Sequence, residues 1–312
     1  MAAITAKMVA DLRTKTGCGM MDCKKALSEA NGDMDEAVKI LREKGLSVAA
    51  KKASRVAAEG IVDIMTSEDG KTVAMIEVNA ETDFVAKNAT FQAFVRGILS
   101  VIIKNRPASI EELNELPYDE SFTVEGKRKD MVFTIGENMT IRRFVVVDGI
   151  TSTYIHGKGT TGVVVKFNTS EEVAGKAEFT EFSKNIALQI AAGNPPTYVS
   201  RDSIPESAVE EELNVQIAAA KNDEKLASKP EAVLKKIVEG KMGKLFYERV
   251  CLVEQPYVKE DSISVGEYVK RTAKELGGEI EISGFWLYEK GEGLEKREDD
   301  FAAEIESLVK GK

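Results

Sequence analysis

The chain has 312 residues, of which 43% are hydrophobic and 30% charged, and its formal net charge is −9. This length predicts two or three domains, and the acidic balance argues against nucleic acid as the main partner, because phosphate binding depends on clustered lysine and arginine. No apolar run reaches the ~18 residues that a membrane span needs. Because the amino terminus also lacks the apolar core of a signal peptide, we expect a cytoplasmic protein with no membrane contact and with three reduced cysteines.

The amino-terminal segment, residues 1–45, shows the apolar spacing of three short helices. Thr5 is suited to cap the first helix, the second begins near Asp22, and Asp33 begins a capping box for the third. Gly45 is expected to end the third helix. Three helices of this length enclose little core of their own, so this module is expected to present a surface.

Residues 46–59 are rich in alanine and predict a short helical linker to the next domain. Its basic side chains are expected to form a solvated face: Lys51, Lys52 and Arg55.

The next domain, residues 60–150, changes to a β-rich pattern. The apolar runs 61–66 and 71–79 predict a hairpin, 89–105 predicts a helix and 140–147 predicts another strand.

The domain at residues 151–289 repeats this order. A predicted hairpin over 152–167 precedes a predicted helix over 177–192, and another strand is expected over 279–289. An 88-residue shift aligns the two long helices, pairing Phe91 with Phe179, Phe94 with Phe182, Ile98 with Ile186, and Ile102 with Ile190. We therefore predict an α+β fold with a duplicated core, in which each half is a small antiparallel sheet covered by helices.

Helical patterns interrupt and follow this second unit. An antiparallel helical hairpin is predicted as an insertion at about 205–235, a helix is predicted over 263–276, and a final amphipathic helix lies in the carboxy-terminal module, residues 290–312.

Two glycine-rich stretches resemble nucleotide-binding motifs and are rejected. GKGTTG at 157–162 matches GxGxxG, but a strand follows it, so no helix amino terminus would face a pyrophosphate. Gly70 begins a fragment of a P-loop that lacks its leading glycine. His156 is the only histidine, and without a CxxC pair or a GxSxG elbow it favours neither a zinc site nor a nucleophilic triad.

The stretch ETDFVAKN at 81–88 lies between a predicted strand and a predicted helix. Thr82 and Asp83 suit a helix start, so Phe84 could simply be the first core residue. The internal repeat favours another interpretation, since the same shift aligns Phe84 with Glu172. If the second copy builds this junction with a charged residue, an aromatic is not required there, and Phe84 becomes a candidate anchor for a partner.

Five stretches that run in order along the whole chain resemble bacterial translation elongation factor Ts: TGCGMMDCKKALSEANGDMDEAVKILREKG, NAETDFVAKN, IGENMTIRRF, KPEAVLKKIVEGKMGKLFYERVCLVEQPYVKE and EKREDDFAAEI. The resemblance implies a guanine nucleotide exchange factor that acts on elongation factor Tu. It also implies a ubiquitin-associated-like (UBA-like) amino-terminal module, two core half-domains with a protruding coiled-coil hairpin, and a carboxy-terminal helix that packs on the partner.

The same resemblance implies which residues touch elongation factor Tu. The principal segment is placed near the partner's magnesium site: Thr82, Asp83, Phe84 and Val85. Further contacts are implied elsewhere: Met20, Met21, Lys24, Ile135, Gly136, His156 and Val258. The chain departs from the family pattern at Lys259, where an apolar residue is usual, and at Thr160, where TTGV replaces RIGV.

Exchange of a bound nucleotide requires no covalent step, so we expect no enzyme chemistry, no cofactor and no metal site in this chain. A 1:1 and a 2:2 complex with elongation factor Tu fit the sequence equally well. The alternative function is an adaptor or chaperone with a UBA-like domain that binds protein without affecting nucleotide.

Overall fold

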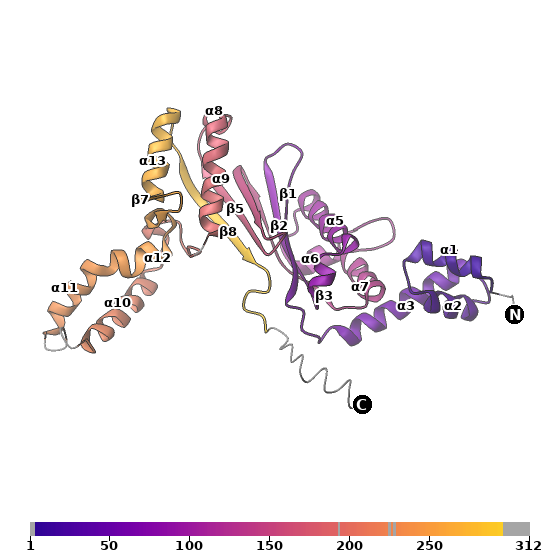
Figure 1. Ribbon diagram of the computed structural model, residues 1–312. Coiled ribbons are helices and arrows are strands. Elements are labelled where there is room, and N and C mark those ends of the chain that lie inside the picture. Colours follow the sequence, from indigo (N-terminus) through magenta and orange to yellow (C-terminus); the bar gives the residue numbers. More distant parts are fainter. Residues whose placement is uncertain (1–3, 193, 224–225, 227–228, 296–312) are drawn as a thin grey trace.

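The computed structural model describes residues 4–192, 194–223, 226 and 229–295. Within these residues the chain forms two three-stranded sheets at the centre of an elongated molecule, with helical parts at both ends (Figure 1). The mixture of helices and small antiparallel sheets agrees with the predicted α+β class.

The amino-terminal helices lie at one end of the molecule (Figure 1). Their bounds are α1 (Ala6–Thr16), α2 (Met20–Glu29) and α3 (Met34–Lys52). Both predicted caps are confirmed, because the Thr5 side chain accepts from the Met8 N–H and the Asp33 side chain accepts from the Glu36 N–H. Leu12 and Leu27, at 0% exposure, are at the centre of the small core between these helices.

The predicted helix end at Gly45 is wrong, since α3 continues through that residue to Lys52. The reason is tertiary packing. A Cβ at Gly45 would lie 3.5 Å from Phe133, so the glycine lets a neighbouring helix approach rather than ending its own. Ala49, further along α3, belongs to the core of the following sheet. The boundary predicted at residue 45 therefore falls inside a continuous helix.

The first half-domain is built on the antiparallel sheet β1-β2-β3. Its elements are β1 (Glu59–Thr66), β2 (Thr72–Ala80), α4 (Asp83–Ala86), α5 (Ala89–Asn105), α6 (Ile110–Glu115), α7 (Val124–Ile135) and β3 (Met139–Asp148). The predicted hairpin, long helix and third strand are confirmed. The helices α6 and α7, which lie between α5 and β3, were not predicted from the sequence.

The second half-domain repeats this plan with the sheet β4-β5-β8. Its elements are β4 (Ile150–His156), β5 (Thr161–Asn168), α8 (Glu171–Ala174), α9 (Ala177–Ala191), α13 (Val265–Leu276) and β8 (Glu281–Glu289). The GKGTTG stretch is the turn between β4 and the start of β5, as predicted. The repeat is confirmed in space, because the eight aligned apolar residues of α5 and α9 are all buried: Phe91, Phe94, Ile98, Ile102, Phe179, Phe182, Ile186 and Ile190.

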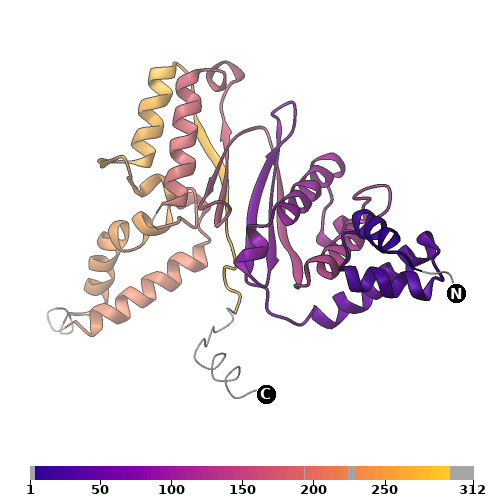
Figure 2. The same cartoon turned by 45° about the vertical axis from the view of Figure 1, so that its right-hand side comes forward.

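The two sheets pack face to face, and helices cover their outer faces. Figure 2 shows α5 outside the first sheet and α9 with α13 outside the second. The middle layer is a separate core that includes Val62, Met75 and Val164. Because β2 has a covered surface on both sides, nearly all its residues are buried rather than every second one.

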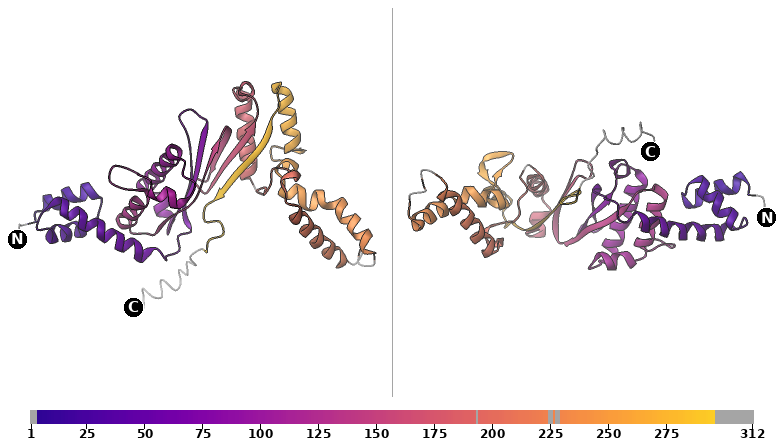
Figure 3. Two further views of the ribbon diagram at one scale, coloured as in Figure 1. Left: turned by 180° about the vertical axis from the view of Figure 1, so that it is seen from behind. Right: turned by 90° about the horizontal axis from the view of Figure 1, so that it is seen from below.

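A helical pair projects from the second half-domain at the end opposite to α1–α3 (Figure 3). It consists of α10 (Glu206–Lys221) and α11 (Glu231–Met242), whose buried residues share one core. The return to the sheet passes through short elements: η2 (Gly243–Tyr247), α12 (Glu248–Val250), η3 (Leu252–Glu254), β6 (Pro256–Tyr257) and β7 (Glu260–Ser264). The amphipathic helix predicted near the carboxy terminus lies outside the described residues.

Candidate functional site

Residues 82–85 form the turn between β2 and α5, and α4 begins there. The Thr82 side chain caps α4 by accepting from the Val85 N–H at 3.4 Å. Its hydroxyl and its N–H also donate to the two carboxylate oxygens of Glu137, at 2.8 and 3.0 Å. Val85 and Ala86 are buried in the core of the first half-domain. This short helix is therefore held by the apolar packing of Val85 and Ala86 and by the hydrogen bonds from Thr82 to the Glu137 carboxylate.

Phe84 points away from that core and is 80% exposed. The interpretation of Phe84 as the first core residue of a helix is thus excluded. Asp83 beside it forms an ion pair with Lys87 at 2.5 Å, one helical turn further on. The hydrogen bond from the Lys87 ammonium lowers the pKa of Asp83, and the charge of Lys290 acts in the same direction. The molecule consequently presents an aromatic ring next to an ionised carboxylate.

The second half-domain contains the same junction without the aromatic ring. Ser170 caps α8 by accepting from the Val173 N–H at 3.2 Å, and Val173 is buried as Val85 is. At the position of Phe84 stands Glu172, whose side chain is 87% exposed. Because two copies of one junction present different side chains to solvent, folding does not explain the phenylalanine.

Ile135 and Gly136 lie next to this junction, at the end of α7. Gly136 ends the helix in the left-handed conformation, with φ 90°, which glycine adopts without steric cost. The next residue is Glu137, the carboxylate that holds Thr82. After it, the Asn138 N–H donates to Glu81 at 2.6 Å. The IGEN stretch and the TDFV stretch, 50 residues apart in the chain, therefore form one hydrogen-bonded surface.

Two basic residues of the predicted linker, Lys52 and Arg55, join the same surface, which corrects their interpretation as a merely solvated face, whereas Lys51 is exposed as predicted. The Lys52 ammonium donates to the Gly136 carbonyl. Arg55 forms an ion pair with Glu81 at 3.5 Å.

His156 reaches this region from the second half-domain. It is exposed at the end of β4, and its Nδ1 lies 3.1 Å from the Tyr154 hydroxyl. The turn that follows is fixed on one side by the Val62 N–H, which donates to the Gly159 carbonyl at 2.8 Å. On the other side, the Lys290 N–H donates to the Thr160 carbonyl at 2.8 Å. Since the Lys290 ammonium also contacts Glu59, which pairs with Ala80 at the end of β2, Lys290 links the histidine turn to the strand that leads into the α4 junction.

The other predicted contacts lie elsewhere. Met20 and Met21 begin α2 with 57% and 63% exposure, and Lys24 follows one turn later, also exposed. Val258, 54% exposed, lies in the turn between β6 and β7. Figure 1 places α2 and β7 on opposite sides of the sheets. The predicted residues therefore form a central group and two outlying groups.

Lys259, the departure from the family pattern, has an intramolecular role. Its ammonium donates to the Asn185 side chain of α9 at 2.7 Å, and the Asn185 amide in turn donates to the Tyr268 hydroxyl at 3.2 Å. The lysine therefore secures the turn that exposes Val258.

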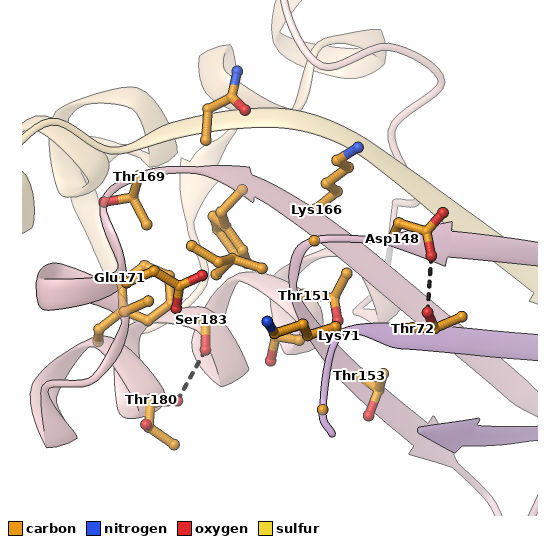
Figure 4. Close-up of a pocket in the computed structure, with 18 of the residues that line it drawn as sticks. Lys71, Thr72, Asp148, Thr151, Thr153, Lys166, Thr169, Glu171, Thr180 and Ser183 are labelled. Carbon is orange, nitrogen blue, oxygen red and sulfur yellow. Dashed lines mark hydrogen bonds between the residues drawn. The ribbon is translucent and has the colours of Figure 1, made fainter. Parts of the chain in front are cut away.

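A polar groove of about 880 Å³ lies where the β1–β2 turn approaches β5 and α9 (Figure 4). Lys71, Lys166 and Glu171 are among the side chains around it, and Thr72 donates to Asp148 at 2.8 Å. None of the residues predicted as partner contacts, all of which are described, lines this groove. This groove is therefore separate from the predicted contact residues.

Within residues 4–192, 194–223, 226 and 229–295, no helix is long and apolar enough to cross a membrane, and no group of three or more His, Cys, Asp or Glu side chains is placed to hold a metal ion. The cysteines are free thiols, as predicted, and all are buried: Cys18, Cys23 and Cys251.

The sequence signals did not identify Glu137 or Lys290. Glu137 lies within the IGEN motif, but only Ile135 and Gly136 of that motif are predicted contacts. Nothing in the local pattern of Lys290 distinguishes it, because its contacts with Thr160 and Glu59 are more than 100 residues away in the chain.

Thr82→Ala is expected to lower the free energy of unfolding more than Ser170→Ala. Each substitution removes a helix cap, which costs ~1 kcal/mol. Only Thr82→Ala also removes a hydrogen bond to the Glu137 carboxylate, for about a further 1 to 2 kcal/mol. Urea denaturation of both variants measures the difference. Equal losses would mean that Glu137 does not stabilise the junction.

Comparison with known proteins gives consistent similarities. Residues 81–292 match the family model described as Elongation factor TS. The chain is 47% identical over 311 residues to Elongation factor Ts of Syntrophotalea carbinolica, which covers 98% of this chain and 99% of that protein. It is 44% identical over 314 residues to Elongation factor Ts of Clostridium kluyveri, with coverage of 99% and 100%. A Clostridium botulinum relative of the same name is 44% identical, with 97% of each chain covered.

Proposed function

The chain belongs to the elongation factor Ts family, and from this we propose that it is a guanine nucleotide exchange factor that promotes GDP release from elongation factor Tu. The observation that carries the proposal is the 80% exposure of Phe84. The short helix that bears it is held by the hydrogen bond from Thr82 to Glu137 and by the buried Val85. A large aromatic side chain is costly to leave in water, and buried aromatic anchors dominate many protein interfaces. The exposed ring is therefore suited to insertion into a partner.

The task of an exchange factor follows from how GDP is held. Backbone amides and a magnesium ion bind its phosphates, so release requires that these contacts weaken. A protein that binds the nucleotide-free partner more tightly than the GDP-bound partner achieves this by linkage, and nucleotide binding expels it in turn. The factor needs only surface complementarity to one state of the partner, and no general base or cofactor.

Phe84 and Asp83 have the properties that this step requires. Insertion of the Phe84 ring between partner helices would displace groups that support the magnesium ion. Asp83, kept ionised by Lys87, would accept hydrogen bonds from donors that the displacement frees. The buried Val85 and the bond from Thr82 to Glu137 keep the pair in place, so that less ordering cost falls on binding.

The outlying groups serve a different role in this proposal. Met20, Met21 and Lys24 would bind the nucleotide-binding domain of elongation factor Tu through the amino-terminal module, which we take to be UBA-like. Val258, the other outlying residue, would contact the same domain from the β6–β7 turn, and α10 with α11 would act as a coiled-coil hairpin. Ile135, Gly136 and His156, which belong to the central group, would bind beside Phe84. Contacts at such distant points would orient the partner so that Phe84 meets its magnesium site.

The decisive experiment follows the release of fluorescent GDP from elongation factor Tu by stopped flow. Micromolar amounts of this protein are expected to increase the release rate in a saturable manner, because they stabilise the nucleotide-free partner. Excess magnesium should oppose the effect. Binding of elongation factor Tu without acceleration of release would reject the exchange function and favour the adaptor function.

A further inference from the structure

The chain leaves β8 and crosses from the second half-domain to the first. Residues 289–292 are bound there by the first sheet. The Gly291 N–H donates to a carboxylate oxygen of Glu77 at 2.8 Å. Arg143 donates to the Glu289 carbonyl at 3.2 Å and to the Glu292 carboxylate at 2.9 Å, and Arg142 donates to the Glu292 carbonyl. This segment is thus held by side chains of β2 and β3.

Glu77 is at the centre of this arrangement, with a side chain that is 0% exposed. It accepts from Arg142 at 3.0 Å, from Arg143 at 2.7 Å and from Asn79 at 3.1 Å, in addition to Gly291. Burial raises the pKa of this carboxyl group, but the hydrogen bonds outweigh burial and hold the pKa below its usual range. A buried carboxylate needs such partners to remain ionised, and one of them is the backbone of the crossing segment.

Lys290 extends the connection to the candidate site. Its N–H bonds to Thr160 in the turn after His156, and its ammonium contacts Glu59 at the start of β1. Glu59 pairs with Ala80, and residues 82–85 follow directly. The crossing segment therefore lies between the His156 turn, on one half-domain, and the Phe84 junction, on the other.

We propose that Glu77 and Gly291 are positioning residues, which clamp residues 289–292 onto the first sheet and so fix the His156 turn relative to Phe84. Since this inference rests on the proposed function, its consequence is an effect on the affinity for elongation factor Tu. When residues 289–292 are bound to the first sheet, the His156 turn and Phe84 are already arranged to meet one partner surface. When they are released, the two must be ordered on binding, which weakens the complex, while the Phe84 ring itself is unchanged.

The chain offers a matched pair of variants. Gly291 and Gly293 both have φ +70°, so alanine meets the same backbone strain at each position. A Cβ at Gly291 would lie 2.2 Å from the Ala58 carbonyl oxygen, whereas nothing lies within 4 Å of a Cβ at Gly293. Gly291→Ala should therefore push residues 289–292 away from the first sheet, while the ion pairs of Glu77 with Arg142 and Arg143 remain intact. Gly293→Ala is the control.

Two measurements on the full-length protein test the proposal. In Gly291→Ala, the amide of residue 291 should exchange with deuterium at least about tenfold faster than the Gly291 amide does in Gly293→Ala, because the hydrogen bond that protects it is donated to Glu77. The concentration of elongation factor Tu·GDP that gives half-maximal exchange should rise about tenfold, with the maximal rate within about twofold. Glu77→Gln should reproduce this separation of affinity from rate.

The outcomes are separable. Equal deuterium exchange in the two glycine variants would overturn the clamp. A fall in maximal rate without a change in half-maximal concentration would overturn its role in affinity. If the wild-type protein itself fails to accelerate GDP release, the proposed function fails, and with it the effect assigned to the clamp. If Glu77→Gln does not fold, the glycine pair still decides the matter.

Discussion

Phe84→Ala is expected to reduce the acceleration of GDP release from elongation factor Tu about 30-fold at low factor concentration, since truncation of an interface hot spot costs ~2 kcal/mol or more. The folded state should be almost unaffected. The ring is 80% exposed, and substitutions at such surface sites change the free energy of unfolding by no more than about 0.5 kcal/mol. Stopped-flow exchange together with urea denaturation measures both quantities.

The internal repeat supplies the control for this variant. Glu172 occupies the same position on α8 and is also exposed, so Glu172→Ala is expected to leave exchange unchanged. An exchange rate of Phe84→Ala equal to that of the wild type would remove Phe84 from the mechanism. A large loss of stability in Phe84→Ala would mean that the ring packs in the folded protein.

Phe182→Ala should produce the opposite pattern. This ring is 1% exposed and contacts Phe167, Phe179 and Tyr268, with ring centroids 5.8, 5.9 and 5.2 Å away. Truncation of a buried phenylalanine leaves a cavity and lowers the free energy of unfolding by about 3 to 5 kcal/mol. Denaturation followed by circular dichroism measures the loss, and exchange activity per folded molecule should be retained at low temperature.

The same substitution thus tests two different properties: Phe84→Ala tests the exchange function, and Phe182→Ala tests the stability of the fold. A loss below about 1 kcal/mol for Phe182→Ala would be inconsistent with a well-packed core around α9. Loss of exchange by the fully folded Phe182→Ala protein would show that packing inside the second half-domain affects exchange directly, and not only through stability.

Local sequence signals predicted much of the fold because the interactions behind them are local. Apolar spacing located α5 and α9, alternation and turn residues located the hairpins, and Thr5 and Asp33 act as the predicted caps. The internal repeat went further. By aligning Phe84 with Glu172, it indicated that the aromatic side chain was not a requirement of the junction, and both positions are indeed exposed.

Other features depend on contacts between residues far apart in the chain. A glycine usually ends a helix, yet at Gly45 the approach of Phe133 makes the small residue a packing site, and α3 continues. A basic linker is usually solvated, yet Lys52 and Arg55 meet the carbonyl of Gly136 and the carboxylate of Glu81. In each case a partner that is distant in sequence outweighs the local preference.

The surface around Phe84 shows most clearly which contacts are local in sequence and which are not. From its residues alone, the chain already specified a capped turn that carries Asp83 and Phe84, because the cap and the buried Val85 are neighbours in sequence. Only the folded structure brings the IGEN loop, the His156 turn and Lys290 to that turn. A backbone bond joins Lys290 to Thr160, and the buried carboxylate of Glu77 binds Gly291, which is 214 residues away in the chain. No local periodicity encodes such contacts.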